Sequence, residues 1–544
     1  MAALAASLAH AFMQWRHPQP KHSADSPKLK PAPSVALTIE DLPPELLLNI
    51  LERLRDRRKN LHALCLTTST LRTATTGILY REYGKSYHLT SLRPFLRTIT
   101  KHPALARHLK ATTITLYYGV PQSPAFKEYV DFFQAITAVS NFPKLHARLS
   151  LALKKGRYDA EAALLMLCSG SVEVMTLDML GEARHNYNFD VEDFLPSFSD
   201  DICLVAELLR TITCNYQDLP EPKPFDRLRS LTIIQNDLEK GSVLRLPFST
   251  ALALLRLPSL EDLALKNGIA TSETATEDSS ASGKSSVRNL TVVDFSFDTS
   301  ALQTLLDRCN GLEKLCISRC SEPGAFAARA LNPRDLRQAL SRHAGTLERL
   351  TFDFGYGSYR QQTICNWRRF TALQYLDTWT TFLANNTEYG QASWAGSDLL
   401  FEKGALDCLL PPNLDTLQLR IPYESEELPR VLRAFAEIHH VPLKCALLVV
   451  DPDTGSYGHT PYHFEPCQGI ELTHSRIIPS DGVGVGGSDD DYGICELMVR
   501  IQDLGGVRAA LLAIADKFEE QGLDAFEEPL AITQPVDSTT GLGP

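Results

Sequence analysis

The fold is set by Leu228-Arg229-Ser230-Leu231-Thr232-Ile233, a stretch whose apolar residues follow the spacing L-x-x-L-x-L. Successive side chains of a β-strand point to opposite faces, so Leu231 and Ile233 share one face. Leu228 enters the same core from the turn before the strand. One such strand cannot bury its apolar face alone, whereas stacked copies share a continuous core. The stretch therefore predicts a stacked array if its spacing recurs.

The spacing does recur. Copies begin at Leu228, Leu260, Leu312, Leu347 and Leu414, and looser copies begin at Val172, Val287 and Leu373. Amphipathic helical stretches precede most copies, over 159–168, 200–212, 247–256, 299–309 and 333–343. After the last copy we expect a helix over 426–439, strands over 443–450 and 494–501, and a capping helix over 506–521. Strands that alternate with helices predict an α/β fold with a parallel sheet.

Two copies extend to a longer motif, L-x-x-L-x-I-x-x-N over 228–236 and L-x-x-L-x-I-x-x-C over 312–320. These copies resemble leucine-rich repeats. The resemblance implies an irregular leucine-rich-repeat-like solenoid over 85–521, with a parallel sheet inside and helices outside. We expect insertions near 271–286 and 451–493, where the repeat pattern is interrupted. The alternative is a non-repetitive α/β domain, because Leu-rich strands after helices occur in many folds.

Residues 38–84 predict a separate unit of three short helices. Thr38, Asp41 and the Pro43-Pro44 pair form a helix-start signal. The apolar stripes are Leu46, Leu47, Ile50, Leu51 and Leu54, then Leu61, Leu64 and Cys65, then Leu71, Ala74, Ile78 and Leu79, the third helix being capped by Thr68, Ser69 or Thr70. So small a unit buries too little surface to be stable alone. We expect its remaining apolar surface, which includes Leu48 and Leu66, to be covered by the rest of the chain or by a partner.

This unit resembles the F-box of fungal proteins. The matching residues are Leu42-Pro43, Glu45-Leu46, Ile50-Leu51, Leu54, Leu61, Leu64, Leu66, Leu71 and the ending Leu79-Tyr80-Arg81. The resemblance implies docking onto the Skp adaptor, and through it onto cullin, in a Skp–cullin–F-box ubiquitin ligase. The adaptor-binding residues would be Leu42, Pro43, Leu46, Ile50, Leu51, Leu54, Leu61, Leu64 and Leu66. The alternative is a helical cap on the next domain.

Two positions differ from the family pattern. Thr67 stands where the family has Val, and Ser69-Thr70 stands where it has a basic pair. These differences keep open a second function, in which the chain is a non-catalytic repeat scaffold that acts outside the ligase.

In a ligase, the repeat domain would hold a protein substrate close to the transfer machinery and so raise its local concentration. Residues that flank the central Leu of a strand would face the inner curve. The candidate substrate-binding residues are Thr232, Ile234, Lys266, Ser318, Asp353, Trp379 and Arg420. Trp379 and Arg420 are of the types most often found as interface anchors.

Composition sets the broad class. The chain has 544 residues, 44% of them hydrophobic and 22% charged, with a formal net charge of −11. The acidic balance argues against nucleic acid as a partner, and no apolar run is long enough to predict a membrane span. The 12 cysteines are scattered without a CxxC pair, so we expect reduced thiols and a cytoplasmic or nuclear location.

No catalytic, cofactor-binding or metal-binding constellation is found, so we expect a chain that is not an enzyme. The Gly-rich run 482–487 lacks the Lys-Ser/Thr ending of a phosphate loop and is followed by three Asp. Asp451-x-Asp453-x-Gly455 has Tyr462 where a calcium loop needs Glu. The His residues, His439, His440, His459, His463 and His474, would form a metal site only if the fold gathered them. An enzyme based on this His- and Gly-rich region is the third function considered.

The ends of the chain have linker-like composition. Residues 1–37 predict a disordered arm, with a mitochondrial transit peptide as the alternative because the first 13 residues are apolar and Ala-rich. Residues 522–544 predict a disordered tail. The predicted division is therefore an arm over 1–37, the F-box over 38–84, the repeat domain over 85–521 and the tail.

Overall fold

A computed structural model gives the structure of the chain. It describes residues 39–84, 92–117, 139–180, 204–219, 221, 223–235, 248–270, 285–297, 299–318, 338–353, 367–379, 406, 409–422, 427–451, 470–477, 494–502 and 504–521. The chain divides into two compact units, Met1–Thr75 and Thr76–Pro544. The predicted arm and tail lie outside the described residues.

The first unit is helical. Its elements are η1 (Ile39–Asp41), α2 (Pro44–Glu52), α3 (Arg58–Cys65) and α4 (Ser69–Leu79), the last of which runs across the boundary between the units. The interior is formed by Leu47, Leu51, Leu61, Leu64 and Leu71, each no more than 8% exposed. The predicted helical stripes are therefore confirmed for these positions.

The helix starts of this unit differ in how they are capped. The N-cap of α2 is Pro43, which makes no side-chain cap, and Pro44 follows at a position where a missing N–H costs nothing. Thr38 of the predicted helix-start signal lies outside the described residues. The backbone N–H of Leu71 donates to Thr68 Oγ1 at 3.3 Å, so Thr68 is the predicted cap of α4.

The second unit is built on one open, mostly parallel sheet, in which 13 strands are described. The strands are β1 (Glu82–Tyr83), β2 (Ala111–Tyr117), β3 (Val174–Leu180), β4 (Ser230–Gln235), β5 (Asp262–Ala270), β6 (Asn289–Phe297), β7 (Lys314–Ser318), β8 (Arg349–Asp353), β9 (Tyr375–Trp379), β10 (Thr416–Pro422), β11 (Cys445–Asp451), β12 (Ile470–Ile477) and β13 (Ile494–Gln502). Each strand from β1 to β11 pairs in parallel with the next. All eight predicted copies of the motif are strands.

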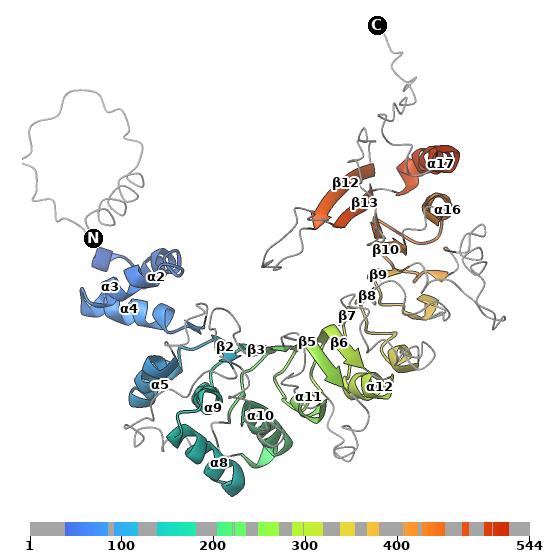
Figure 1. Cartoon of the computed structure of the whole chain (residues 1–544). Coiled ribbons are helices and arrows are strands. Elements are labelled where there is room, and N and C mark those ends of the chain that lie inside the picture. The colour runs from blue at the N-terminus through green and yellow to red at the C-terminus, as the bar shows by residue number, and fades with distance from the viewer. Residues whose placement is uncertain are drawn as a thin grey trace, which may run out of the picture. The chain divides into compact units, whose positions relative to one another are not determined.

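Helices separate most of these strands along the chain. They are α5 (Leu92–Lys101), α6 (Pro103–Ala106), α8 (Pro143–Lys154), α9 (Tyr158–Cys168), α10 (Leu204–Cys214), η6 (Tyr216–Asp218), α11 (Phe248–Leu254), α12 (Thr299–Arg308), η9 (Trp367–Arg369), α16 (Glu427–Ala436) and α17 (Leu504–Gln521). Within the second unit, the strands follow one another along a curve, and α9, α10, α11 and α12 lie on its outer side (Figure 1). The α/β class with helices on one face of a parallel sheet is confirmed at this level.

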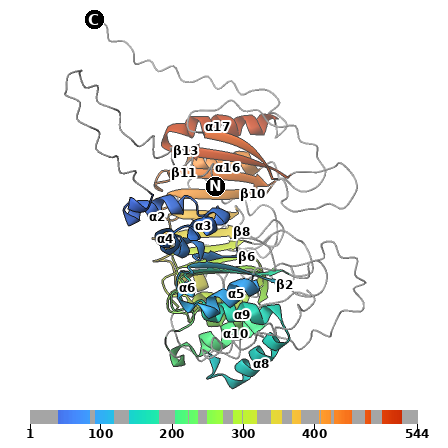
Figure 2. The ribbon, with the colours of Figure 1, turned by 90° about the vertical axis from the view of Figure 1, so that its left-hand side faces the viewer.

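The sheet is not parallel at its C-terminal end. Strand β13 pairs antiparallel with β11, and β12 is the outermost strand, antiparallel to β13. The expectation that 451–493 is an excursion from the fold is therefore wrong for Ile470–Ile477. Antiparallel pairing needs no crossover helix, so the chain can return directly into the sheet. Figure 2 shows α16 and α17 beside these last strands.

The predicted capping helix α17 packs on α16. Arg433 Nη2 forms an ion pair with Asp516 Oδ1 at 2.6 Å, and Arg508 Nη2 donates to the carbonyl of Ile438 at 2.7 Å. Leu511, Ile514 and Ala515 are buried. Among the helices in the described part of the chain, none combines the length and apolar character that crossing a membrane would require.

A repeated backbone contact fixes the register at the start of the strands. The carbonyl of Glu173 accepts the N–H groups of Arg229 and Ser230 at 2.8 and 3.0 Å, and that of Arg229 accepts those of Glu261 and Asp262 at 2.8 and 2.9 Å. The same pair of bonds recurs at the carbonyls of Arg81, Lys110, Glu261, Arg288, Glu313, Glu348, Gln374 and Asp415. In each of the eight L-x-x-L-x-L copies, the residue whose carbonyl accepts the two bonds is the second one, and Arg81 and Lys110 take the same part before β1 and β2. We call this series the carbonyl ladder.

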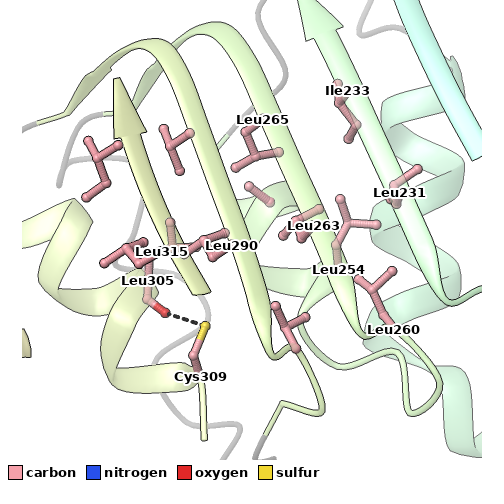
Figure 3. Packing of buried hydrophobic residues seen from close by; sticks show 14 of the residues in the cluster. Leu231, Ile233, Leu254, Leu260, Leu263, Leu265, Leu290, Leu305, Cys309 and Leu315 are labelled. Atoms are coloured by element: carbon pink, nitrogen blue, oxygen red, sulfur yellow. Dashed lines mark hydrogen bonds between the residues drawn. The ribbon is translucent and has the colours of Figure 1, made fainter. Parts of the chain in front are cut away.

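The apolar residues that follow the ladder form the core. Leu231, Leu263, Leu290 and Leu315 lie in register on β4 to β7, each at most 1% exposed. Leu254 and Leu305 pack on them from α11 and α12 (Figure 3). Burying each such side chain contributes about 1.5–3 kcal/mol. The shared face inferred from the motif is therefore the face that the helices cover.

Helix α9 carries a carboxylate within this core. Glu161 is 2% exposed, and its Oε1 accepts a hydrogen bond from Arg93 Nε of α5 at 2.6 Å. Arg93 Nη2 also donates to the carbonyl of Gly156 at 3.2 Å. Burial raises the pKa of Glu161 from 4.5 to about 7, although Arg93 opposes this shift.

This carboxylate should make stability depend on pH. Because the folded pKa lies above the unfolded value, ionisation of Glu161 opposes folding, and stability falls as pH rises from 4.5 through 7. Relative to Glu161→Gln, the wild-type chain should lose about 2 kcal/mol between pH 5 and pH 8. Urea unfolding at both pH values measures the difference. Arg93→Gln should be more destabilising at pH 8 than at pH 5, and equal pH profiles for all three proteins would contradict this assignment.

Candidate functional site

The face of the sheet opposite the buried Leu positions carries the predicted substrate-binding residues. In the register of the strands, Ile234, Lys266, Ser318 and Asp353 lie in one row across β4, β5, β7 and β8. Trp379 and Arg420 pair with each other at the corresponding positions of β9 and β10. Thr232 lies in the neighbouring row, which we call the middle row and which continues through Ala264, Thr291, Cys316, Thr351, Asp377 and Gln418. The structure thus places all seven predicted residues on two adjacent rows.

Arg420 joins two carboxylates on this face. Its Nη1 lies 3.2 Å from Asp353 Oδ2, and its Nε donates to Asp377 Oδ1 at 3.3 Å. Asp377 is 4% exposed, whereas the Arg420 side chain is 23% exposed. Burial raises the pKa of Asp377, Arg420 opposes the shift and the nearby Asp353 adds to it. The predicted residues Asp353 and Arg420 are therefore brought together, with Asp377 between two charges.

Asp377 was not among the candidate residues selected from the sequence. It occupies the position between Leu376 and Thr378, both of which are buried. A carboxylate in the middle of a Leu-rich strand is a signal that could have identified it. Alternation puts that position on the face opposite the buried Leu positions, which we call the open face. Its pairing with Arg420 could not be read from the sequence, since β9 and β10 are separated by a long connection.

A second arrangement lies at the start of β7 to β9. Lys314, Arg349 and Tyr375 are adjacent in the register, in a row that we call the entry row. The guanidinium of Arg349 lies 4.9 Å from the centre of the Tyr375 ring, and the Tyr375 hydroxyl donates to Gln418 Oε1 at 3.2 Å. Burial raises the pKa of Tyr375 and that of the Cys316 thiol, so both groups stay protonated near neutral pH. Tyr375 is therefore a fixed platform for Arg349.

The first unit exposes large apolar side chains. Leu46, Leu48 and Leu66 are 41%, 44% and 69% exposed. Among the predicted adaptor-binding residues, Leu51, Leu61 and Leu64 are buried in the unit, Leu42, Ile50 and Leu54 are half-buried, and Pro43, Leu46 and Leu66 are exposed. The buried three hold the helices together, and the other six are available to a partner at least in part.

Thr67 and its neighbours lie at the surface of the same unit. Thr67 Oγ1 donates to the carbonyl of Leu64 at 2.8 Å, and Ser69 and Thr70 are exposed. The Thr67 hydroxyl is thus satisfied at the end of α3 and does not need a partner from outside.

The predictions about metal and phosphate chemistry have different outcomes. In the ranges that the structure describes, no group of three or more His, Cys, Asp or Glu residues could hold a metal ion. His439 and His440 are exposed. Residues 482–487, Asp453, His459 and His463 lie outside the described residues. Cys65, predicted to be part of the helical packing, is half-buried, and its Sγ lies 3.3 Å from Thr75 Oγ1.

Comparison with models of known protein families gives no match for this chain, and no curated protein matches it. The two surfaces are therefore interpreted from their own chemistry.

The Arg420 cluster allows a direct test of the open face. Arg420→Gln removes the cation that both Asp353 and Asp377 contact, and should destabilise the second unit by about 2 kcal/mol, less than for a fully buried pair because Arg420 is partly solvated. Adding Asp377→Asn should restore part of the loss. Arg288→Gln is the matched control, since Arg288 pairs with Glu313 and its side chain is 61% exposed, and should cost under about 0.5 kcal/mol. Unfolding midpoints that are equal for Arg420→Gln and Arg288→Gln would refute the coupling.

Proposed function

We propose that the chain is the substrate-recognition subunit of a Skp–cullin–F-box ubiquitin ligase. The first unit would dock on the Skp adaptor as an F-box, and the second unit would bind a protein substrate as a leucine-rich-repeat-like solenoid. The chain itself would be non-catalytic, and it would act in the cytoplasm or nucleus.

The exposed leucines of the first unit carry the proposal. Apolar side chains exposed singly are ordinary, whereas several gathered on one small unit are typical of an interaction surface. Leu46 and Leu66 are exposed, and both belong to the F-box resemblance. Pro43, Leu46 and Ile50 stand at positions i, i+3 and i+7, and so share one side of α2. Leu47 and Leu51 form the neighbouring, buried stripe. The same short helix therefore has one apolar stripe for its own interior and a second that is available for contact.

The composition of the open face supports the second half of the proposal. It presents charged, aromatic and hydroxyl side chains from several strands at once, and protein partners are often anchored on Arg and Tyr. Arg420, Arg349 and Tyr375 are held by neighbours that are themselves half-buried or buried. Ordered anchors of this kind lose less conformational entropy on binding.

The alternative is a repeat scaffold that acts outside the ligase. Ser69 and Thr70, which replace the basic pair of the family, are exposed where that pair would contribute charge. The two functions differ in the fate of the bound partner. A receptor shortens the half-life of its partner, whereas a scaffold leaves the half-life unchanged when the chain is deleted.

Co-purification with the Skp adaptor tests the proposed function. The double variant Leu46→Asp/Leu66→Asp removes two apolar contacts and should weaken adaptor binding by at least about tenfold, because burying each leucine is worth more than 1 kcal/mol. Titration of the purified adaptor, followed by calorimetry, measures the change.

The matched control replaces leucines that are equally exposed on the second unit. Leu151 and Leu512 are 55% and 41% exposed. Leu151→Asp/Leu512→Asp should bind the adaptor like the wild-type chain. Retained affinity in the first double variant, or a wild-type chain that never retains the adaptor, would exclude the receptor.

A further inference from the structure

Charged residues along the strand-entry edge are usually paired. Lys110 Nζ lies 2.7 Å from Glu173 Oε1, Arg288 Nη1 lies 2.9 Å from Glu313 Oε1, and Lys444 Nζ lies 2.9 Å from Asp415 Oδ2. The first two pairs join neighbouring rungs of the carbonyl ladder, and Lys444 pairs with Asp415, the last rung, from the next strand. At these distances a cation on one strand attracts a carboxylate on the next, which stabilises the pairing of these strands.

Lys314 and Arg349 lie one residue further along their strands, in the entry row, and are not paired in this way. They face each other in the register of β7 and β8, so their backbones are about 4.8 Å apart. Both are exposed, and no carboxylate within the described ranges forms an ion pair with either of them. Like charges directly opposite on neighbouring strands are destabilising. An anion placed between the two would remove that cost.

The arrangement around this pair is ordered. The guanidinium of Arg349 lies over the ring of Tyr375, which is held through Gln418, so one face of the guanidinium is covered, and among the described residues no carboxylate pairs with its N–H groups. Arginine in this state presents a planar fork that matches a carboxylate or phosphate. Thr351 and Cys316 follow in the middle row, where small polar side chains allow a peptide backbone to approach the sheet.

We propose that Lys314 and Arg349 form an anion-recognition point that binds an Asp- or Glu-rich segment of the recruited protein. The positive point consists of two side chains on a chain whose net charge is −11, so it can pair with a few carboxylates of a protein segment, whereas the long, dense charge of a nucleic acid would be repelled by the rest of the chain. The inference rests on the proposed function only in taking this segment as part of the ligase substrate. Binding of the segment itself requires no adaptor.

Fluorescence anisotropy with the full chain, without adaptor, tests this site. The probe is a fluorescein-labelled peptide of alternating Asp and Ser, and its neutral counterpart has Asn in place of Asp. The acidic peptide should bind at least about tenfold more tightly than the neutral peptide, and Lys314→Gln/Arg349→Gln should remove this preference, because two partly exposed ion pairs together supply about that factor.

The control removes the same charge elsewhere on the same edge. Arg288→Gln/Lys444→Gln deletes two cations that are already paired, and should change the affinity for the acidic peptide by less than about threefold at physiological salt. Equal losses in the two double variants would show a non-specific charge effect and overturn the site. Equal binding of the acidic and neutral peptides would also overturn it, as would tighter binding of a single-stranded DNA of the same charge.

Failure of this experiment is distinguishable from failure of the proposed function. The peptide is measured on the second unit in the absence of adaptor, whereas the adaptor is measured through Leu46 and Leu66 of the first unit. A chain that binds the adaptor but not the acidic peptide keeps the ligase assignment and loses this site.

Discussion

The carbonyl ladder is the constraint on which the second unit depends. Each rung uses one carbonyl oxygen to accept two backbone N–H groups from the next strand, as Arg229 does for Glu261 and Asp262. Unpaired backbone groups are costly when buried, so the ladder fixes where each parallel strand from β2 to β11 begins relative to its neighbour. Once the starts are aligned, Leu231, Leu263, Leu290 and Leu315 must fall in one line, and the helices can cover them as a continuous apolar face. The side chains on the opposite face are aligned by the same contact.

Because the strands are aligned, residues that are far apart in the sequence lie side by side on the open face of the sheet. Asp353, Asp377 and Arg420 belong to three strands with long connections between them, yet the register brings their charges within ion-pair distance. Lys314, Arg349 and Tyr375 are gathered in the same way at the start of their strands. In both clusters the charged and aromatic groups come from neighbouring strands rather than from one loop. The open face therefore combines a rigid scaffold with polar groups whose order is set by the backbone.

The described part of the first unit has a small interior and is not built from repeats. Its interior is limited to a few leucines, among them Leu47, Leu51 and Leu61, because three short helices cannot enclose more. The remaining apolar side chains, Leu46 and Leu66, stay at the surface. Stability in the second unit comes from repetition of one buried face, whereas the first unit keeps apolar area that a partner can cover. These two solutions agree with a chain that joins an adaptor to a bound protein, which is the function proposed above.

The sequence by itself determined the strands that carry the full Leu motif, the helices before them and the face on which Thr232, Lys266 and Arg420 lie, because side-chain alternation is local. It did not reveal β2, where Thr112 replaces the second Leu, nor β1, where Tyr83 fills that place beside Phe95. Only the tertiary structure decided that β13 and β12 return antiparallel, and that Asp377 meets Arg420. Strand order and cross-strand partners depend on hydrogen bonds between segments far apart in the chain, and local periodicity carries no information about which distant carbonyl a strand will meet.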